Sequence, residues 1–179
     1  MIPSEIQIQA KKEYCFPAVV EILLKFYGYN NMDQCTIAKE LCKLTHQSST
    51  SFIQDGLQIR PGILNRFFIE HGFSLRENYI PYTKIYDEYD FECKVKEQME
   101  QKSFIICGYN YSWLFLKRSG SANHVSIICS VNSKAGMITL FDPGPEDYGH
   151  KEVKIDDLWY ALKAAQAGIW CVQSLKDRK

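Results

Sequence analysis

The chain has 179 residues, of which 46% are hydrophobic and 23% are charged, as is typical of one globular domain with an apolar core. Its 21 Lys and Arg residues balance its 21 Asp and Glu residues, so the formal net charge is zero and argues against nucleic-acid binding. No run approaches the roughly 20 consecutive apolar residues of a membrane span, and the N-terminus lacks the pattern of a signal peptide. We therefore expect one soluble, cytoplasmic domain over residues 1–179. Delivery by a route without a cleavable signal and the oligomeric state are left open.

The chain contains seven cysteines, an odd number without a Cys-x-x-Cys pair. This pattern argues against a disulfide framework and a zinc ribbon, and it indicates a reducing compartment. Most of the cysteines lie in apolar patterns, where a free thiol behaves as a small hydrophobe. Five are expected to be mostly buried for this reason: Cys35, Cys42, Cys107, Cys129 and Cys171. Cys93 is left open, and Cys15 is treated separately below.

The first predicted helix covers residues 16–27. Pro17 suits its first turn, and Gly28 is placed for a left-handed C-terminal cap. Only Glu21 and Lys25 interrupt its apolar surface, so this helix should be buried on most sides.

Apolar residues at helical spacing predict two further helices. One begins after Asp33, its expected cap, and is followed by a polar loop over residues 45–60. The other opens at Pro61 and closes at Gly72. A short helix is also expected near residues 91–101.

After residue 102 the pattern becomes rich in β-branched and aromatic residues. Turn residues separate four short segments that predict strands. These segments are SFIICGY, HVSIICSV, MITLFD and GIWCVQS, with VNSKAG as a hairpin loop between the second and the third. A helix over residues 155–165 is expected to pack across this antiparallel sheet. Helices that precede strands predict an α+β domain.

Cys15 falls at the N-terminus of the first predicted helix. Unsatisfied backbone N–H groups and the helix dipole favour a negative charge there, and therefore the thiolate, which is the nucleophilic form. A cysteine enzyme also needs a base for the thiol proton, a group that orients the base, and donors that stabilise the oxyanion.

His124 is the best candidate base because it opens a predicted strand, from which an imidazole can project at a rigid edge. The other histidines are more simply surface residues: His46, His71 and His150. Asp142 ends the next strand, and an antiparallel hairpin places the start of one strand beside the end of the next. We therefore expect the two side chains to form a hydrogen bond or to approach within one water. An ordinary Asp-Pro turn is the alternative.

Gln9 lies six residues before Cys15 and is a candidate oxyanion donor alongside the Cys15 backbone N–H. Gln7 could take the same place. The histidines are dispersed and none has a carboxylate at helical ligand spacing, so neither a metal nor another cofactor is expected.

These residues, in this order, resemble the papain-like cysteine peptidases. Gln9-x5-Cys15 is followed by Pro17-Ala18, by His124 at the start of a strand, and by Asp142-Pro143 at the end of the next. The set is most similar to the double-glycine (bacteriocin) leader peptidase group and its free-standing relatives, and RPGILNRFFIEHGF resembles that group's helix between nucleophile and base.

The resemblance implies a bacterial thiol protease with a papain-like α+β fold. It implies Cys15 as nucleophile, His124 as base, Asp142 as the orienting residue and Gln9 in the oxyanion hole. The expected reaction is cleavage of a peptide or isopeptide bond in a peptide or protein substrate, through an acyl-enzyme. An acyltransferase with the same triad and a catalytically silent binding module of the same fold are the alternatives.

Two positions depart from the pattern of the group. It usually carries glycine directly after the nucleophile and directly before the histidine, where this chain has Phe16 and Asn123. Together with Trp113, these side chains are candidates for the wall of a substrate groove.

Overall fold

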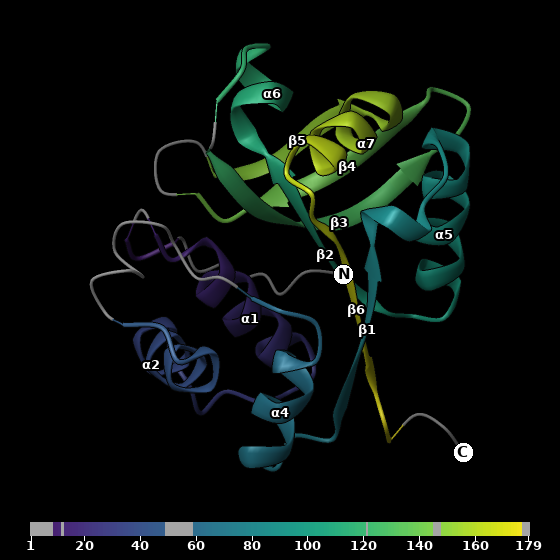
Figure 1. Ribbon diagram of the computed structural model, residues 1–179. Coiled ribbons are helices and arrows are strands. Elements are labelled where there is room, and N and C mark those ends of the chain that lie inside the picture. Colours follow the sequence, from purple (N-terminus) through teal and green to yellow (C-terminus); the bar gives the residue numbers. More distant parts are fainter. Residues whose placement is uncertain (1–8, 12, 49–58, 121, 145–147, 177–179) are drawn as a thin grey trace. The chain divides into compact units, whose positions relative to one another are not determined.

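The computed structural model describes residues 9–11, 13–48, 59–120, 122–144 and 148–176 (Figure 1). Gln7 and most of the predicted loop over residues 45–60 lie outside the described residues. The chain divides into two compact units. The first comprises Met1–Glu77, Pro143–Tyr148 and Val172–Lys179, and the second comprises Asn78–Asp142 and Gly149–Cys171.

The first unit contains the helices α1 (Cys15–Phe26), α2 (Gln34–Thr45) and α4 (Ile63–Glu70). α2 packs against both α1 and α4 (Figure 1). The predicted first helix is confirmed to within one residue at each end, and Gly28 follows it with a left-handed φ of 83°. All residues from Phe16 to Leu24 are buried, as the sequence predicts. Glu21 lies among them and pairs with Lys25 at 3.0 Å, one helical turn later.

The predicted cap of α2 is confirmed, since the carboxylate of Asp33 accepts the backbone N–H of Thr36 at 2.7 Å. For α4 the predicted start at Pro61 is wrong. Gly62 has a φ of 85°, which no helical residue adopts, so Pro61 lies in a turn and the helix begins at Ile63.

Six strands form one sheet with the order β1-β6-β2-β3-β4-β5. They are β1 (Leu75–Pro81), β2 (Phe104–Asn110), β3 (Asn123–Asn132), β4 (Met137–Asp142), β5 (Gly149–Lys154) and β6 (Gly168–Ser174). β2 to β5 lie wholly in the second unit and pair in antiparallel fashion. The four predicted strands and their hairpin are confirmed.

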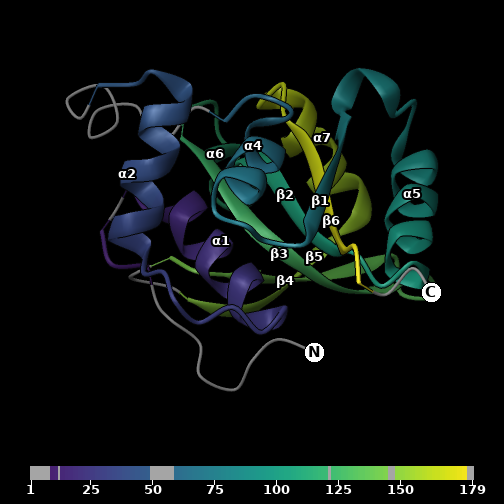
Figure 2. The same cartoon turned by 90° about the horizontal axis from the view of Figure 1, so that it is seen from below.

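Within the second unit, helices pack on one face of β2 to β5 (Figure 2). They are α5 (Glu88–Glu100), α6 (Tyr111–Leu116) and α7 (Ile155–Ala164), and a short 3-10 helix, η1 (Tyr82–Lys84), precedes α5. Phe91 of α5 stacks on Trp159 of α7 at 6.1 Å between ring centroids, inside an apolar cluster that includes residues of the sheet. The chain is therefore α+β, as predicted.

Four elements of the described chain lie outside the predicted pattern: β1, β5, α6 and η1. Among the described residues, no helix combines the length and the apolar character that crossing a membrane requires.

Candidate active site

Cys15 is the first residue of α1, and its side chain is partly exposed. Its backbone N–H belongs to the first turn, where N–H groups have no acceptor within the helix. Pro17 in the same turn has no N–H, which suits a position without an intrahelical partner. The thiol therefore lies where the helix dipole favours an anion, as the sequence predicts.

Gln9 is bound to the turn that leads into α1. Its side chain is buried, with 3% of the residue exposed, and its amide nitrogen donates to the carbonyl of Lys11 at 2.6 Å. The same carbonyl accepts the backbone N–H of Tyr14, the residue before Cys15, at 2.9 Å. The backbone N–H of Gln9 donates to the carbonyl of Pro143 at 2.7 Å. These contacts fix Gln9 beside the entry to α1, whereas a role in an oxyanion hole stays a prediction.

The register of β3 and β4 brings His124 and Asp142 together. Ile127 pairs with Phe141, so Asp142, one residue later, lies diagonally across from His124 on the same face of the sheet. Nε2 of His124 is 2.7 Å from Oδ1 of Asp142. The predicted contact between the two side chains is confirmed. Their catalytic roles stay predictions.

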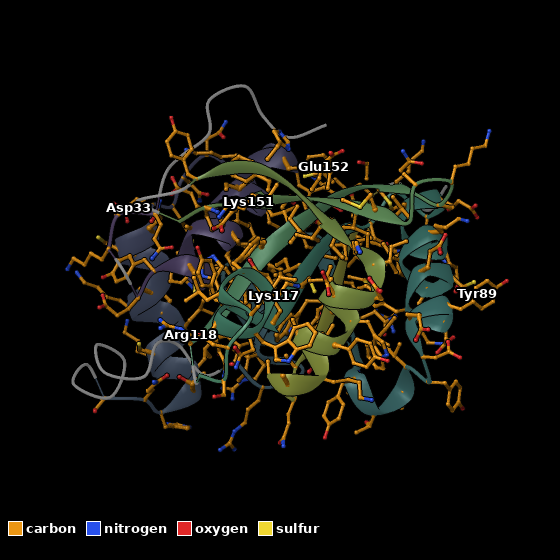
Figure 3. All side chains as sticks on the ribbon, turned by 90° about the horizontal axis from the view of Figure 1, so that it is seen from above. Asp33, Tyr89, Lys117, Arg118, Lys151 and Glu152 are labelled. Atoms are coloured by element: carbon orange, nitrogen blue, oxygen red, sulfur yellow. The ribbon has the colours of Figure 1, made fainter. Side chains whose placement is uncertain are left out.

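Asp142 is more buried than His124, with 1% of the residue exposed. A buried carboxylate is costly unless charged or hydrogen-bonding groups compensate it. Here Oδ1 faces His124 and Oδ2 accepts the ammonium of Lys151 at 2.7 Å. Figure 3 shows Lys151 and its neighbour Glu152 on β5.

Two aromatic rings confine the imidazole of His124. Tyr109 of β2 pairs with His124 across the sheet, and its ring centroid is 5.7 Å from that of the imidazole. Tyr111 at the start of α6 lies at 5.6 Å, and both rings meet the imidazole edge-on. The hydroxyl of Tyr109 is held 2.8 Å from that of Ser126. The orientation of the imidazole is thus fixed by packing as well as by Asp142.

The segment that leads into β3 is held by Asn110, which is buried. Its side-chain oxygen accepts the backbone N–H of Trp113 at 2.9 Å and caps α6, while its side-chain nitrogen donates to the carbonyl of Gly120 at 2.7 Å. The backbone N–H of Tyr111 donates to the carbonyl of Ala122 at 2.7 Å. α6 and the segment before His124 are therefore fastened to one another.

The three candidate groove residues differ in their surroundings. Phe16 is buried in α1, and Trp113 is partly exposed with its ring 6.0 Å from that of Tyr160 on α7. Asn123 is exposed and pairs with Asn110 in regular antiparallel register. Its φ is not positive, so the backbone does not require glycine at this position. A groove formed by these residues stays a prediction.

The other cysteines fall into two groups. Cys107 and Cys171 are buried and Cys129 is partly buried; burial raises the pKa of all three thiols, to about 12 for Cys129 and Cys171. Cys42 is partly exposed, and burial raises its pKa as well.

The prediction that Cys35 is mostly buried is wrong, because this residue is exposed, as is Cys93. The buried face of α2 runs through Ile37, Ala38, Leu41 and Leu44. Cys35 lies in the first turn, three residues before Ala38, so it is at the edge of this face, where its side chain stays exposed.

The remaining histidines are less suited to act as a base. His46 and His150 are exposed. His71 is half-buried, contrary to the prediction of a surface residue, because its ring packs against Phe67 and Phe73 at the end of α4. Within the ranges that the structure describes, no group of three His, Cys, Asp or Glu side chains could hold a metal ion.

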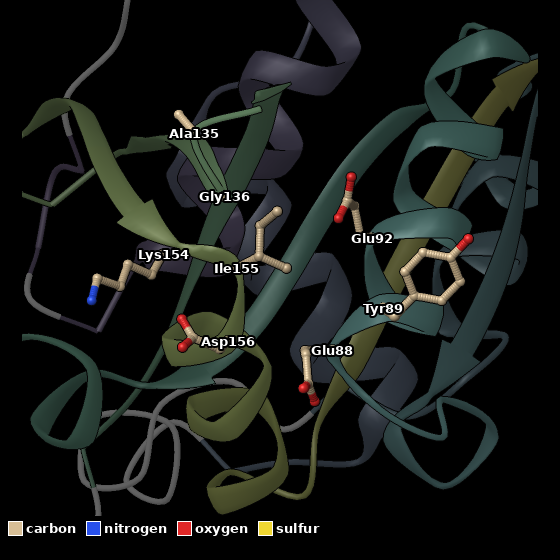
Figure 4. Close-up of a pocket in the computed structure, with 8 residues that line it drawn as sticks. All are labelled: Glu88, Tyr89, Glu92, Ala135, Gly136, Lys154, Ile155 and Asp156. Atoms are coloured by element: carbon tan, nitrogen blue, oxygen red, sulfur yellow. The ribbon is translucent and has the colours of Figure 1, made fainter. Parts of the chain in front are cut away.

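A hollow of about 390 Å³ lies in the second unit, away from the predicted site residues, none of which lines it (Figure 4). α5 contributes Glu88, Tyr89 and Glu92, and the opposite side includes the segment around Ile155. The ammonium of Lys154 points away from α5 in the close-up. The polar side chains that line the hollow therefore do not point toward one common position, and we assign no function to it.

Among the described residues, Tyr109, Tyr111 and Lys151 lie beside His124 or Asp142 and are missing from the sequence-predicted site. Tyr109 ends a predicted strand, and pairing that strand with the next one would have placed it opposite His124. Lys151 and Val153 face the same side of β5, but the alternation in GHKEVK is too short and too polar to predict a strand. No sequence signal indicates Tyr111.

No protein-family model matches the chain, and no curated protein matches it significantly. The candidate residues in each unit therefore carry the functional argument themselves. They provide a buried carboxylate bound to an imidazole at the end of a sheet, and a partly exposed thiol at a helix N-terminus. A general base and a nucleophile need these two environments.

Proposed function

We propose that the chain is a cysteine peptidase-like thiol hydrolase with a papain-like fold, formed by a single domain and active in the bacterial cytoplasm. Its substrate is a peptide or protein, cleaved at a peptide or isopeptide bond. The hydrogen bond of 2.7 Å between His124 and Asp142 is the observation that supports this proposal most directly. It joins two of the three residues that the sequence pattern suggests for a triad, although 18 positions separate them in the chain.

Asp142 determines which nitrogen of His124 acts. When Nε2 carries the proton shared with Asp142, the lone pair of the neutral imidazole is on Nδ1. In the proposed reaction Nδ1 takes the proton of Cys15, and the thiolate attacks the carbonyl carbon of the substrate. The carbon–nitrogen bond then breaks, and the imidazolium gives its proton to the leaving amine.

The second half of the reaction uses the same groups in reverse. Nδ1 removes a proton from water, and the hydroxide attacks the thioester carbon. The carbon–sulfur bond breaks, the acid leaves, and the proton returns to Cys15. The negative charge on the carbonyl oxygen is stabilised in each half by the backbone N–H of Cys15 and the amide of Gln9.

The test uses peptide-based acyl probes that react with thiols. Wild-type protein should be labelled at Cys15, and Cys15→Ala should lose both this label and turnover of cleavable peptides. Cys93→Ala is the matched control, because Cys93 is an exposed thiol far from α1 in the sequence. This variant should keep the label at Cys15.

The products separate the two enzymatic reactions. Water as the acceptor gives two fragments whose summed mass exceeds that of the substrate by one water, whereas an added amine gives a ligated product if the chain is an acyltransferase. Hydrolysis in the presence of amine is the expected result. Labelling of Cys15 no faster than that of Cys35 and Cys93, without any turnover, would contradict the enzyme assignment and favour a binding module.

A further inference from the structure

Lys151 is a second charged partner of Asp142. Its ammonium lies 2.7 Å from Oδ2, and only 13% of the lysine side chain is exposed. Asp142 thus has one cationic partner on Oδ2 and one titratable partner, His124, on Oδ1. The carboxylate cannot turn without breaking one of these two contacts.

Aromatic rings of α6 hold the ammonium in this position. It lies 4.8 Å from the ring centroid of Phe115 and 5.6 Å from that of Tyr111. The rings of Phe115 and Tyr111 are themselves 4.9 Å apart. A cation over two ring faces is stabilised by their electrons, so Lys151 is favoured in its charged form at this place. Tyr111 therefore contacts both Lys151 and the imidazole of His124.

The charges of this group decide how basic His124 is. A lone buried carboxylate would strongly favour the imidazolium, because opposite charges attract more in a medium of low dielectric constant. Lys151 already compensates the charge of Asp142, so a proton on His124 adds a second positive charge to a neutral pair. Within the described part of the second unit, the rings of Tyr109 and Tyr111, each with a phenolic hydroxyl, also face the imidazole.

We propose that Lys151 is a positioning residue that fixes the orientation of Asp142 and limits the basicity of His124. The effect of Lys151 on catalysis rests on the function proposed above. In that reaction a less basic imidazolium gives its proton to the leaving amine more readily, while the fixed carboxylate keeps Nε2 engaged and Nδ1 directed to the thiol.

The experiment follows the imidazole signals of the full chain by NMR as the pH is changed. The variants are Lys151→Met, which keeps the length of the side chain without its charge, and Lys151→Arg, which keeps the charge. Lys154→Met is the matched control, because it removes one positive charge from the same strand at an exposed position. The signal of His124 is identified by its loss in His124→Asn.

Lys151→Met should raise the titration midpoint of His124 by about one pH unit, the size expected when one nearby charge is removed. Lys151→Arg and Lys154→Met should leave the midpoint close to that of the wild type. If Lys151→Met does not fold, Lys151→Gln provides the same comparison, since its amide can still donate to Asp142. A midpoint that is unchanged or lower in these uncharged variants would overturn the proposal.

This measurement is independent of turnover. If Cys15 proves unreactive but the midpoint of His124 rises in Lys151→Met, the hydrolase assignment fails and the electrostatic role of Lys151 stands. If Cys15 is reactive and the midpoint does not move, the role of Lys151 fails and the hydrolase assignment stands.

Discussion

His124, the proposed general base, is held in one ring orientation by groups from three elements. Asp142 of β4 binds Nε2, while Tyr109 of β2 and Tyr111 of α6 meet the ring edge-on. A hydrogen bond alone would still permit the ring to tilt about the shared proton. The two tyrosine rings oppose that tilt. A substitution of either tyrosine should therefore change the orientation of the imidazole without removing its hydrogen bond to Asp142.

The cysteines should differ in reactivity in an order set by exposure and by local charge. Limiting iodoacetamide at neutral pH should modify Cys15 first, because a thiolate is favoured at the start of α1. Cys35 and Cys93 should follow, because their side chains are exposed to the reagent. Peptide mass spectrometry of the native protein after increasing reaction times provides the measurement.

The slowest group should consist of Cys107, Cys129 and Cys171, whose pKa values are raised by burial. At neutral pH a thiol with a pKa of about 12 is almost entirely protonated, as is expected for Cys129 and Cys171. Equal rates for all seven cysteines in the presence of denaturant serve as the control. Modification of Cys35 or Cys93 before Cys15 would remove the support for an activated nucleophile.

At the scale of elements, β1 supplies the cap that α4 lacks in its own sequence. α4 begins after Gly62, which has no side chain, and the buried carboxylate of Glu77 accepts the backbone N–H groups of Gly62 at 3.0 Å and of Asn65 at 3.3 Å. In return, the amide of Asn65 donates to the carbonyl of Glu77 at 3.1 Å and accepts its N–H at 2.8 Å. Four hydrogen bonds therefore join the helix start to the strand.

Glu77→Ala should lower the free energy of unfolding by about 1–3 kcal/mol, the usual cost of losing a helix cap and leaving buried N–H groups without a partner. Burial raises the pKa of Glu77, although hydrogen bonds from Gly62, Asn65 and Leu64 act in the opposite direction. A carboxyl group whose pKa is higher in the folded state than in the unfolded state contributes less stability as the pH rises through both values. The cost of Glu77→Ala should therefore be larger at pH 4 than at pH 7.

Urea unfolding at the two pH values measures this difference. Glu70→Ala is the matched control, since Glu70 is an exposed residue of the same helix, and it should cost less than about 0.5 kcal/mol at either pH. A cost of Glu77→Ala that is larger at pH 7 would show that the hydrogen bonds outweigh the desolvation of the carboxylate.

Two physical reasons explain why the sequence does not predict β1, β5 and α6. β1 and β5 are the two edges of the sheet, and edge strands carry charged residues that discourage pairing with other chains. LRENYIP and GHKEVK accordingly lack the apolar runs of the central strands. α6 has only six residues, all apolar or aromatic except one serine, which is too short to display helical periodicity. Its start is determined by the cap from Asn110, not by an apolar pattern.

At the scale of the whole molecule, the order of helices followed by strands can be predicted from the sequence, and the division into units cannot. Two short segments, Pro143–Tyr148 and Val172–Lys179, belong to the same unit as α1. Their membership depends on contacts between residues far apart in the chain, such as the hydrogen bond from the N–H of Gln9 to the carbonyl of Pro143. A periodic pattern reports local structure only, so it carries no information on such contacts.

The same limit divides the candidate site. Cys15 at a helix start and the contact between His124 and Asp142 follow from local patterns and from one hairpin, which the sequence contains. Lys151 reaches Asp142 from a third strand, β5. Since the sequence does not predict β5, it does not predict this contact either. The residues proposed to act directly are thus predictable here, while the side chains that surround them depend on the completed sheet.

The central claim is that the Cys15 thiol shares its proton with His124, and the pH dependence of Cys15 alkylation tests it most directly. Iodoacetamide rates are measured from pH 5.5 to pH 8.5 in wild type, in His124→Ala and in the control His150→Ala, which removes an exposed imidazole near Asp142 in the sequence. An ordinary thiol, with a pKa of about 8.5, slows by roughly 500-fold over this range.

In wild type and in His150→Ala the rate at Cys15 should fall by less than about tenfold, because a thiolate–imidazolium pair persists at low pH. In His124→Ala the rate should follow the steep decline of an ordinary thiol. Wild-type and His124→Ala profiles that coincide would show that Cys15 and His124 do not form a catalytic pair, and would contradict the proposed hydrolase.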